Sequence, residues 1–451
     1  MARNRHAVIW TRLSGQPEKM GDLVLSTERA AFTYTRDYLE SGRAGFCLLG
    51  DGRFWGEDTV TYPVSERIPV FPRLLSLIPG NNPRNLQRRH YLDLLRNTLG
   101  REPSPGAETE WWLLLAGGHG GIGHIDVFAD DRVAESWYGR DLPPTAAAGN
   151  RSQLWHMLKN TVLDEPLDFD PQLIEKALGP TPSVGGMIPK LLVSMTPGET
   201  RARFYPPDMP GKHNVILKVE PPEYAGLLDL EMLCLEVHRH AGFETPAAQR
   251  FSDNDLHFLA IERFDQQAGA PLPMESLFSV IATGDHHFRT TGDILLDELG
   301  KVLARLGEVV SLADDTAEQL YRRILMALLT GNGDLHLDNI ALLGGVDDCR
   351  LSPIYDPAPM RAWPRHNLLS AIPFDAAGYA DHGAYFTALG QAFGLSGTQV
   401  ARCVDDALEA TADFGEQLQA LTRVPAAQRR LLHEIVVSER ALLATRTTDS
   451  G

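Results

Sequence analysis

Cysteine is scarce in this 451-residue chain, and its four cysteines lie far apart, at Cys47, Cys234, Cys349 and Cys403. This number and spacing exclude a disulfide-rich scaffold and a zinc site built from cysteines. Long apolar runs are also missing, since stretches such as residues 111–117 fall far short of the ~20 residues that span a bilayer. The first ten residues lack the apolar segment of a signal peptide. We therefore expect a soluble, cytoplasmic protein that does not bind membranes.

Positive charge is in deficit, because 42 Lys and Arg residues stand against 59 Asp and Glu residues, giving a formal net charge of −17. Proteins that coat nucleic acid neutralise phosphates with Lys and Arg, so this function class is disfavoured, although a local basic patch remains possible. Apolar residues make up 43% of the chain and charged residues 22%, which excludes a disordered chain, a collagen or a coiled coil. The length suggests two to four domains or subdomains.

The order of the predicted elements divides the chain into three parts. The first ~145 residues combine one or two helical patches with short strand-like runs at 7–11, 43–49, 111–116 and 123–128. The next part has predicted strands at 190–195, 214–219 and 256–262 and a helix at 226–240. From Met274 onward helical periodicity dominates, with a Gly/Asp-rich interruption at 331–356. We expect an α+β protein with a sheet-rich lobe, a helical lobe and a ligand cleft between them.

The strongest motif follows the predicted helix 318–330. A polar loop contains Asp334, His336 and Asn339, and an apolar hairpin with a turn at residues 344–345 is predicted to end at Asp356. The Asp-x4-Asn spacing is that of a phosphotransferase catalytic loop, in which the Asp accepts a hydroxyl proton and the Asn binds a metal. Asp356 is then placed to bind Mg²⁺, which prefers hard oxygen ligands. A solvated loop of Asx turns remains the alternative for this segment taken alone.

A second group of motifs lies in the sheet-rich lobe. Lys218 sits in an apolar strand, where burial costs free energy unless an opposite charge is near, and Glu231 follows on the predicted helix. A strand lysine paired with a helix glutamate orients nucleotide phosphates in kinases. The turn at 183–190 can direct backbone N–H groups at phosphate, and the segment 262–265 can present backbone groups to an adenine. A snorkelling lysine, a solvated glutamate and an ordinary hairpin turn are the alternatives.

In this order the motifs resemble the HipA family of serine/threonine kinase toxins from bacterial type II toxin–antitoxin systems. The matching pieces are Ser183-x-Gly-Gly-x-x-Pro-Lys190, Ile-Leu-Lys218, a Glu-bearing helix, Glu262-Arg-Phe-Asp265, Asn332-Gly-Asp334-x-His336-x-x-Asn339 and Pro353-x-Tyr-Asp356. The resemblance implies a bilobal, protein-kinase-like fold. It assigns residues 1–145 to a small N-terminal α+β subdomain, 146–265 to the kinase N-lobe with its phosphate loop, and 266–451 to a mainly helical C-lobe with the catalytic loop.

The resemblance also assigns roles to individual residues. Asp334 would be the catalytic base, His336 would shape the loop, and Asn339 and Asp356 would bind Mg²⁺. The residues expected to contact ATP are Gly185, Gly186, Met187, Ile188, Pro189, Lys190, Lys218 with its partner Glu231, and, facing the adenine, Glu262 and Phe264. Ser183 matches a serine whose autophosphorylation ejects the phosphate loop and switches the kinase off.

The function implied by the resemblance is ATP- and Mg²⁺-dependent phosphorylation of a serine or threonine. The expected substrate is a protein of translation such as an aminoacyl-tRNA synthetase, so that growth stops until a HipB-like antitoxin binds the kinase. That antitoxin would also bind operator DNA, so this chain would reach DNA only indirectly. A small-molecule phosphotransferase and a catalytically silent module that binds an antitoxin or a DNA complex remain the two rival hypotheses.

Several residues depart from the family or imitate other sites. Asp338 stands where many members have a lysine, and the phosphate loop carries an apolar Met187-Ile-Pro. Residues 118–123 fit the dinucleotide motif G-x-G-x-x-G, but the strand-like residues 124–128 follow where that motif requires a helix, so we predict a glycine-rich hairpin turn. Cys234 and His238 lack a second pair of zinc ligands, so this histidine and the others are predicted to be surface or hydrogen-bonded core residues.

Overall fold

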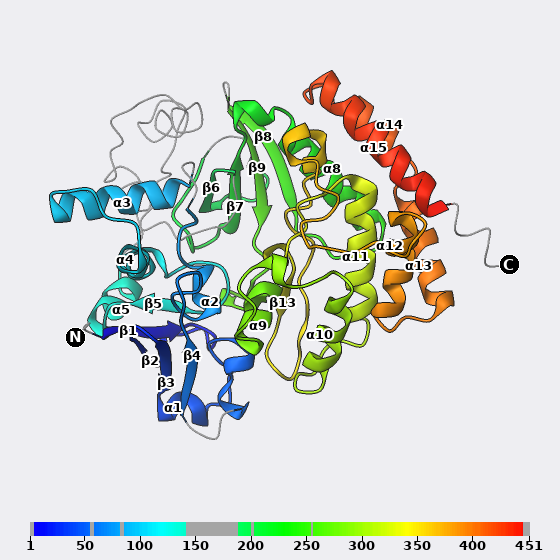
Figure 1. Ribbon diagram of the computed structural model, residues 1–451. Coiled ribbons are helices and arrows are strands. Elements are labelled where there is room, and N and C mark those ends of the chain that lie inside the picture. Colours follow the sequence, from blue (N-terminus) through cyan, green and yellow to red (C-terminus); the bar gives the residue numbers. More distant parts are fainter. Residues whose placement is uncertain are drawn as a thin grey trace. The chain divides into compact units, whose positions relative to one another are not determined.

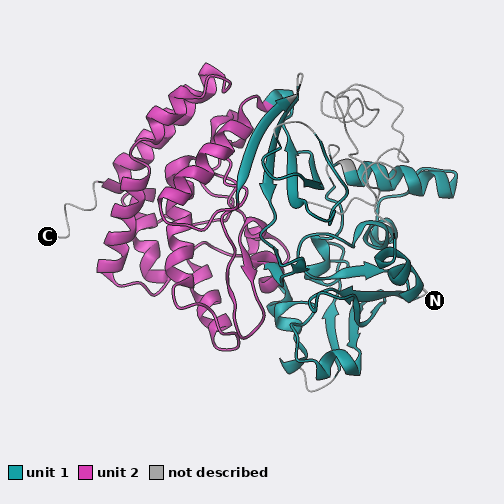
Figure 2. Ribbon diagram, turned by 180° about the vertical axis from the view of Figure 1, so that it is seen from behind, with its two compact units in different colours: residues 1–223, 247–275, 282–287 teal, residues 224–246, 276–281, 288–451 magenta. Residues whose placement is uncertain are grey.

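The computed structural model describes residues 4–54, 58–81, 85–140, 188–199, 203–253 and 256–444. Helices and sheets are both present, which confirms the predicted α+β class (Figure 1). The chain divides into two compact units, of which unit 1 comprises residues 1–223, 247–275 and 282–287 and unit 2 comprises 224–246, 276–281 and 288–451 (Figure 2). The predicted boundary at 145/146 lies outside the described residues, and the three-part division stays a prediction.

The N-terminal part of unit 1 is built on an antiparallel sheet in the order β4-β3-β2-β1-β5. Its strands are β1 (Arg5–Thr11), β2 (Glu18–Leu25), β3 (Arg29–Tyr34), β4 (Thr59–Pro63) and β5 (Asp126–Phe128). Burial alternates along β3, so Phe32 and Tyr34 share one face, where both rings contact Phe46. The helices of this part are α1 (Arg36–Glu40), α2 (Pro72–Leu75), α3 (Leu86–Leu99), α4 (Ala107–Gly117) and α5 (Asp131–Tyr138).

A second antiparallel sheet in unit 1 has the order β6-β7-β9-β8. Its strands are β6 (Lys190–Met195), β7 (His213–Val219), β8 (Ala248–Asp253) and β9 (Leu256–Glu262), followed by the small hairpin of β10 (Gln266–Gln267) and β11 (Ala270–Pro271). Strands β6, β7 and β9 coincide with the predicted strands. Strand β8 was missed, because its sequence AQRFSD carries little apolar alternation.

Unit 2 is mainly helical, and helices dominate the chain after Met274, as the sequence predicted. It contains α8 (Leu227–His240), α10 (Glu298–Gly307), α11 (Thr316–Thr330), α12 (His382–Ala392), α13 (Gly397–Ala410), α14 (Phe414–Ala420), α15 (Ala426–Ala444) and a hairpin of β13 (Ala341–Leu343) and β14 (Arg350–Leu351); β12 (Met274–Ser276) and α9 (Leu277–Gly284) have residues in both units. Gly390 of α12 lets the helices pack closely, since a Cβ there would lie 3.1 Å from the Tyr321 ring and 2.5 Å from Val400.

Two predicted strands of the N-terminal part are wrong. Residues 111–116 belong to helix α4, and residues 43–49 run into a short 3₁₀ turn at Leu48–Gly50. Helix α4 buries Trp111, Leu113 and Leu114 on different sides, and a short apolar run buried all round cannot be assigned to strand or helix from its periodicity. The glycine-rich residues 118–123 therefore connect a helix to β5 and do not form a hairpin turn.

Candidate active site

The predicted catalytic loop begins where α11 ends. Gly331 adopts a left-handed conformation with φ of 76°, and the N–H of Asn332 bonds to the carbonyl of Ala327, which closes the last turn. A Cβ at position 331 would lie 2.4 Å from Leu432 Cδ1 on α15. Both the backbone angle and the neighbouring helix therefore require a glycine at this point.

Two asparagines fix the main chain of Asp334. The Oδ1 atom of the buried Asn332 accepts a hydrogen bond from the Asp334 N–H at 3.0 Å, and Asn339 Nδ2 donates to the Asp334 carbonyl, also at 3.0 Å. The Asp334 side chain is exposed. These two hydrogen bonds hold the backbone of a residue that is itself exposed to solvent.

His336 shapes the middle of the same loop. Its Nδ1 atom accepts a hydrogen bond from the Asp338 N–H at 3.2 Å, and its carbonyl accepts one from the Asn339 N–H at 2.9 Å. These bonds form the short 3₁₀ turn Leu337–Asn339. The histidine thus sets the path of the backbone between Asp334 and Asn339.

Asp356 lies beyond strand β14 and not at its end, which corrects the predicted hairpin. Strand pairing stops at Leu351, and the following residues are held by single tertiary contacts: the Ser352 N–H bonds to the Ala341 carbonyl at 2.8 Å, and the Ile354 N–H bonds to the Glu244 carbonyl at 2.9 Å. Asp356 itself has φ of 50°, an unfavourable angle for a residue with a side chain.

Arg323 and Tyr355 connect the Asp356 segment to the rest of unit 2. The guanidinium of Arg323 donates to the Ser352 carbonyl, and the Tyr355 hydroxyl donates to the Asp338 carbonyl at 2.7 Å. Burial, together with the carboxylates of Asp338 and Asp356, raises the pKa of Tyr355 far above its ordinary value. The hydroxyl therefore remains a donor, and it ties the residue before Asp356 to the loop that carries Asn339.

The donors in this region fit a hard cation. The Asn339 amide nitrogen faces Asp334, so its Oδ1 atom points the other way, and Asp356 supplies a half-buried carboxylate. In the part of the chain that the structure describes, no group of three or more His, Cys, Asp or Glu residues is arranged for a metal. Two oxygen donors suit Mg²⁺, which commonly takes its remaining ligands from phosphate and water.

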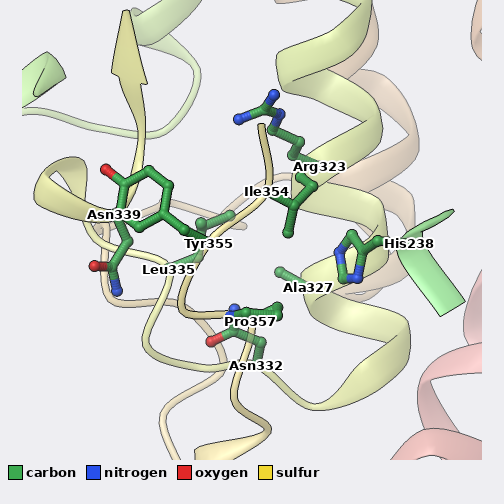
Figure 3. A pocket seen from close by; sticks show the side chains of 9 residues that line it. All are labelled: His238, Arg323, Ala327, Asn332, Leu335, Asn339, Ile354, Tyr355 and Pro357. Atoms are coloured by element: carbon green, nitrogen blue, oxygen red, sulfur yellow. The ribbon is translucent and has the colours of Figure 1, made fainter. Parts of the chain in front are cut away.

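A small pocket lies beside this loop (Figure 3). Its volume of about 10 Å³ is close to that of one water molecule and far too small for a nucleotide. Burial lowers the pKa of Arg323, which lines the pocket, to about 10, and its buried Nε atom has no hydrogen-bond partner in the described structure. The other lining residues are His238, Ala327, Asn332, Leu335, Asn339, Ile354, Tyr355 and Pro357.

Two of the predicted phosphate-binding residues are lysines on neighbouring strands of unit 1. Lys190 of β6 lies directly opposite Lys218 of β7, so their side chains project from the same face of the sheet. Their exposed fractions are 6% and 2%. Two buried ammonium groups on one face favour anions there. Two residues of the predicted phosphate loop, Ile188 and Pro189, are described, and the Pro189 carbonyl accepts a hydrogen bond from the Val219 N–H at 3.0 Å. The other predicted loop residues lie outside the described residues: Ser183, Gly185, Gly186 and Met187.

The remaining predicted nucleotide residues are distributed over both units. Glu262 ends β9 and lies 3.3 Å from His213, and Phe264 is half-buried. Both belong to unit 1. Glu231 is completely buried on α8 of unit 2, so its pairing with Lys218 stays a prediction.

Sequence reasoning did not assign roles to Arg323, Tyr355 or Ser276. Arg323 follows Leu320 by three residues and so lies on the apolar face of α11. A cation on an apolar helix face was the one signal in the sequence that could have indicated a buried polar contact. The Ser276 hydroxyl donates to the carboxylate of Asp338 at 2.9 Å. Asp338, at the position where the resemblance implies a lysine, is thus held in place by its own hydrogen bond.

A family model described as the HipA-like C-terminal domain matches residues 182–414, which are 233 of the 451 residues. The chain belongs to this HipA-like family. Its fold matches that of a chain in a solved complex of the Shewanella oneidensis MR-1 toxin–antitoxin system, which contains HipA, HipB and operator DNA. The match has a TM-score of 0.64 and 17% sequence identity, and it covers 98% of this HipA-like chain and 100% of the compared chain. The predicted HipA-like, protein-kinase-like fold is therefore confirmed.

Two relatives cover shorter stretches of the HipA-like chain. A Haemophilus influenzae protein named "Putative kinase" is 28% identical over 175 residues, which cover 36% of this chain and 50% of the relative. A Sinorhizobium fredii protein named "Putative kinase Y4dM" is 26% identical over 173 residues, which cover 35% of this chain and 38% of the relative. The matches thus span half or less of the relatives' length.

No helix among the described residues of the HipA-like chain is both long enough and apolar enough to cross a bilayer.

Proposed function

We propose that this HipA-like chain is an ATP- and Mg²⁺-dependent serine/threonine protein kinase and the toxin of a toxin–antitoxin system. The observation that carries the proposal is the loop 331–339, in which Asn332 and Asn339 fix the main chain of Asp334 and leave its carboxylate exposed. Family membership and the two relatives named as kinases support the same activity.

In the proposed reaction, the Asp334 carboxylate accepts the proton of the substrate hydroxyl as that oxygen attacks the γ-phosphorus of ATP; the bond from this phosphorus to the β–γ bridging oxygen breaks, and ADP leaves. Asn339 and Asp356 would hold the metal, which when bound would offset the negative charge of the phosphates. His336 keeps Asp334 and Asn339 at their spacing. The exposed position of Asp334 allows a serine or threonine of a protein to reach it.

The nucleotide would be bound mainly by unit 1. Lys190 and Lys218 pair with its phosphates, because their face of the sheet carries two buried positive charges. Gly185 and Gly186 belong to the proposed phosphate loop, and Glu231 orients Lys218. Glu262 and Phe264 lie at the end of β9, where we place the adenine.

For partners, we propose a HipB-like antitoxin and a protein substrate from translation, such as an aminoacyl-tRNA synthetase. The solved structure with the same fold is a complex that contains HipA, HipB and operator DNA. A formal net charge of −17 disfavours direct binding to DNA and favours a basic protein partner.

Labelled ATP tests the proposal directly. Wild type, Asp334→Asn and Asp347→Asn would be incubated with Mg²⁺, labelled ATP and cell lysate; Asp347 is an exposed carboxylate in the β13–β14 turn. We expect loss of a general base to reduce labelling by at least about 100-fold in Asp334→Asn and not in the control. Equal labelling would refute the assignment, turnover with small alcohols alone would indicate a small-molecule phosphotransferase, and no turnover by wild type would indicate a silent binding module.

A further inference from the structure

A buried ion pair stands at the end of strand β9, in the segment to which the proposed function assigns the adenine. Arg263 Nε lies 2.9 Å from Asp265 Oδ1, and Arg263 Nη2 lies 2.6 Å from Asp265 Oδ2. Both side chains are only 3% exposed. Burial disfavours the charged guanidinium, but the neighbouring Asp265, Asp208 and Asp126 together outweigh that effect and raise the pKa of Arg263, so the guanidinium stays charged.

The glycine-rich loop 118–123 completes the hydrogen bonds of this pair. Arg263 Nη2 also donates to the Gly121 carbonyl at 2.7 Å, and the Gly123 N–H donates to Asp265 Oδ2 at 2.7 Å. Gly123 has φ of +84°, and a Cβ there would lie 2.5 Å from Arg73 Nη2. The glycines therefore allow a backbone to approach an ion pair of the same chain, which accounts for a motif that the proposed reaction does not use.

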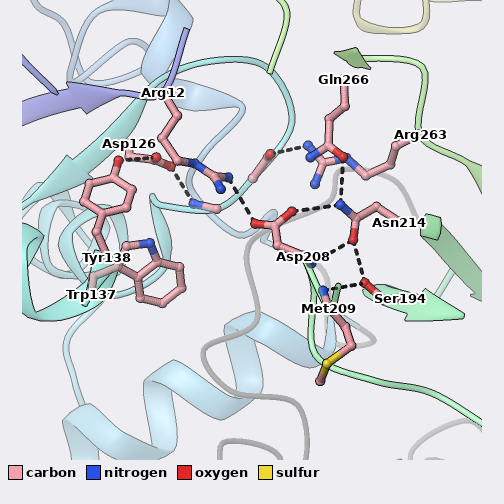
Figure 4. Close-up of polar contacts among 12 residues, drawn as sticks. Arg12, Asp126, Trp137, Tyr138, Ser194, Asp208, Met209, Asn214, Arg263 and Gln266 are labelled. Carbon is pink, nitrogen blue, oxygen red and sulfur yellow. Dashed lines mark hydrogen bonds and ion pairs between the residues drawn. The ribbon is translucent and has the colours of Figure 1, made fainter. Parts of the chain in front are cut away.

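A second connection reaches the same segment through Arg12, the residue that follows strand β1 (Figure 4). Arg12 Nη2 lies 3.1 Å from Asp208 Oδ2, and Asp208 accepts a hydrogen bond from Asn214 Nδ2 at 2.8 Å. The Asn214 side chain also donates to Gln266 Oε1 at 2.7 Å, and the backbone carbonyl of Asn214 accepts a hydrogen bond from the Arg263 backbone N–H at 3.0 Å. Arg263 and Gln266, on either side of Asp265, are thus held by a network that starts at Arg12.

Two further bonds join residues of the N-terminal part to strands β12 and β6. The buried carboxylate of Glu275 accepts the Leu48 N–H at 2.6 Å, and the buried Gln87 side chain of α3 donates to the Lys190 carbonyl at 2.9 Å. We name the described part of residues 4–140 the N-terminal subdomain. Its contacts reach the proposed adenine segment through Gly121 and Gly123, and the proposed phosphate lysine Lys190 through Gln87.

We propose that the N-terminal subdomain sets the affinity for ATP by fixing the segment Glu262–Asp265, with Asp265 as the positioning residue. The inference rests on the proposed nucleotide site and adds a function for the subdomain. Removing the charge of Asp265 leaves Arg263 buried without its counter-ion, and the backbone from Glu262 to Phe264 is then free to move. Asp265 acts through that backbone and not on the reacting atoms.

Equilibrium binding of ATP and steady-state kinetics test this role. Asp265→Asn changes the ion pair, and Gly123→Ala disturbs the same contact from the subdomain. Glu110→Gln is the matched control, because its ion pair with Arg88, at 3.0 Å, lies within the subdomain between α3 and α4. Displacement of a fluorescent ATP analogue would give the Kd for ATP, and circular dichroism would show which variants fold.

We expect the Kd and KM for ATP to rise at least tenfold in Asp265→Asn and at least threefold in Gly123→Ala, with kcat at saturating ATP within threefold of wild type. Glu110→Gln should leave KM within twofold. Folded variants that bind ATP like wild type, or an equal loss in Glu110→Gln, would overturn the inference while the kinase proposal stands. If Asp265→Asn does not fold, Gly123→Ala decides. A wild type that binds no ATP would refute the proposed function itself.

Discussion

A buried ionic cluster links the C-terminal helix α15 to the candidate catalytic loop. Glu439 lies 2.9 Å from Arg361 Nη1 and 2.5 Å from His382 Nε2, and its side chain is 5% exposed. Arg361 also uses its backbone N–H to bond to the Gly331 carbonyl at 3.2 Å. We expect Glu439→Gln to destabilise unit 2 and to loosen the start of the loop.

The size of the effect follows from burial. The Arg361 side chain is 9% exposed, so the substitution leaves a cation in the interior without its counter-ion. Breaking such a pair costs about 3–5 kcal/mol. For a unit of this size the melting temperature should fall by roughly 10 °C. Glu318 provides the matched control, because its partner Arg402 is 56% exposed, and pairs of that kind contribute less than about 1 kcal/mol.

Urea unfolding followed by circular dichroism would measure the free energy of unfolding of wild type, Glu439→Gln and Glu318→Gln. Labelling with ATP on the same samples would report on the loop. The reasoning is refuted if Glu439→Gln unfolds within about 1 kcal/mol of wild type, or if the two variants lose the same stability.

Three further predictions concern other parts of the chain. Mass spectrometry should find phosphate on Ser183, and Ser183→Ala should increase toxicity; phosphate at other positions alone would contradict loop ejection. Burial and the nearby Arg73 lower the pKa of His124 to about 3. As the pH falls below about 6.5, His124 is therefore protonated in the unfolded chain but stays neutral in the folded one, and this difference favours unfolding. Stability should then drop by roughly 2 kcal/mol at pH 5, and His124→Gln should flatten the pH dependence in urea titrations. Gly331→Ala should cost about 1–3 kcal/mol more than Gly394→Ala, since both have positive φ but only Gly331 has a close neighbour, Leu432; equal losses would contradict the packing argument.

The sequence predicted those elements whose pattern is local. Strands β6, β7 and β9 are short, mainly apolar runs, and helix α11 ends at Gly331 because a glycine there adopts the left-handed angle that stops the helix. The loop of Asp334 and Asn339 could be found for the same reason, because the fixed spacing of its polar residues can be recognised in the sequence without knowing the fold.

Contacts between distant residues could not be predicted in this way. The path of the backbone to Asp356 depends on Arg323 and on the Glu244 carbonyl, and neither lies near Asp356 in the sequence. Helix α4 was mistaken for a strand because its apolar run is buried by tertiary packing on several sides. In both cases the local structure is determined by contacts with residues that are distant in the sequence. No local sequence pattern indicates which distant residues will be in contact.

The glycine-rich residues 118–123 show why a short motif needs its structural context. Glycines expose backbone N–H and C=O groups without a side chain, and this property suits a phosphate group and a buried ion pair equally well. In a dinucleotide site the N–H groups would point from a helix N-terminus toward an anionic ligand. Here a strand follows, and the Gly123 N–H meets the anion of Asp265 instead. Under our proposal this loop therefore contributes to nucleotide binding indirectly, through a carboxylate of its own chain.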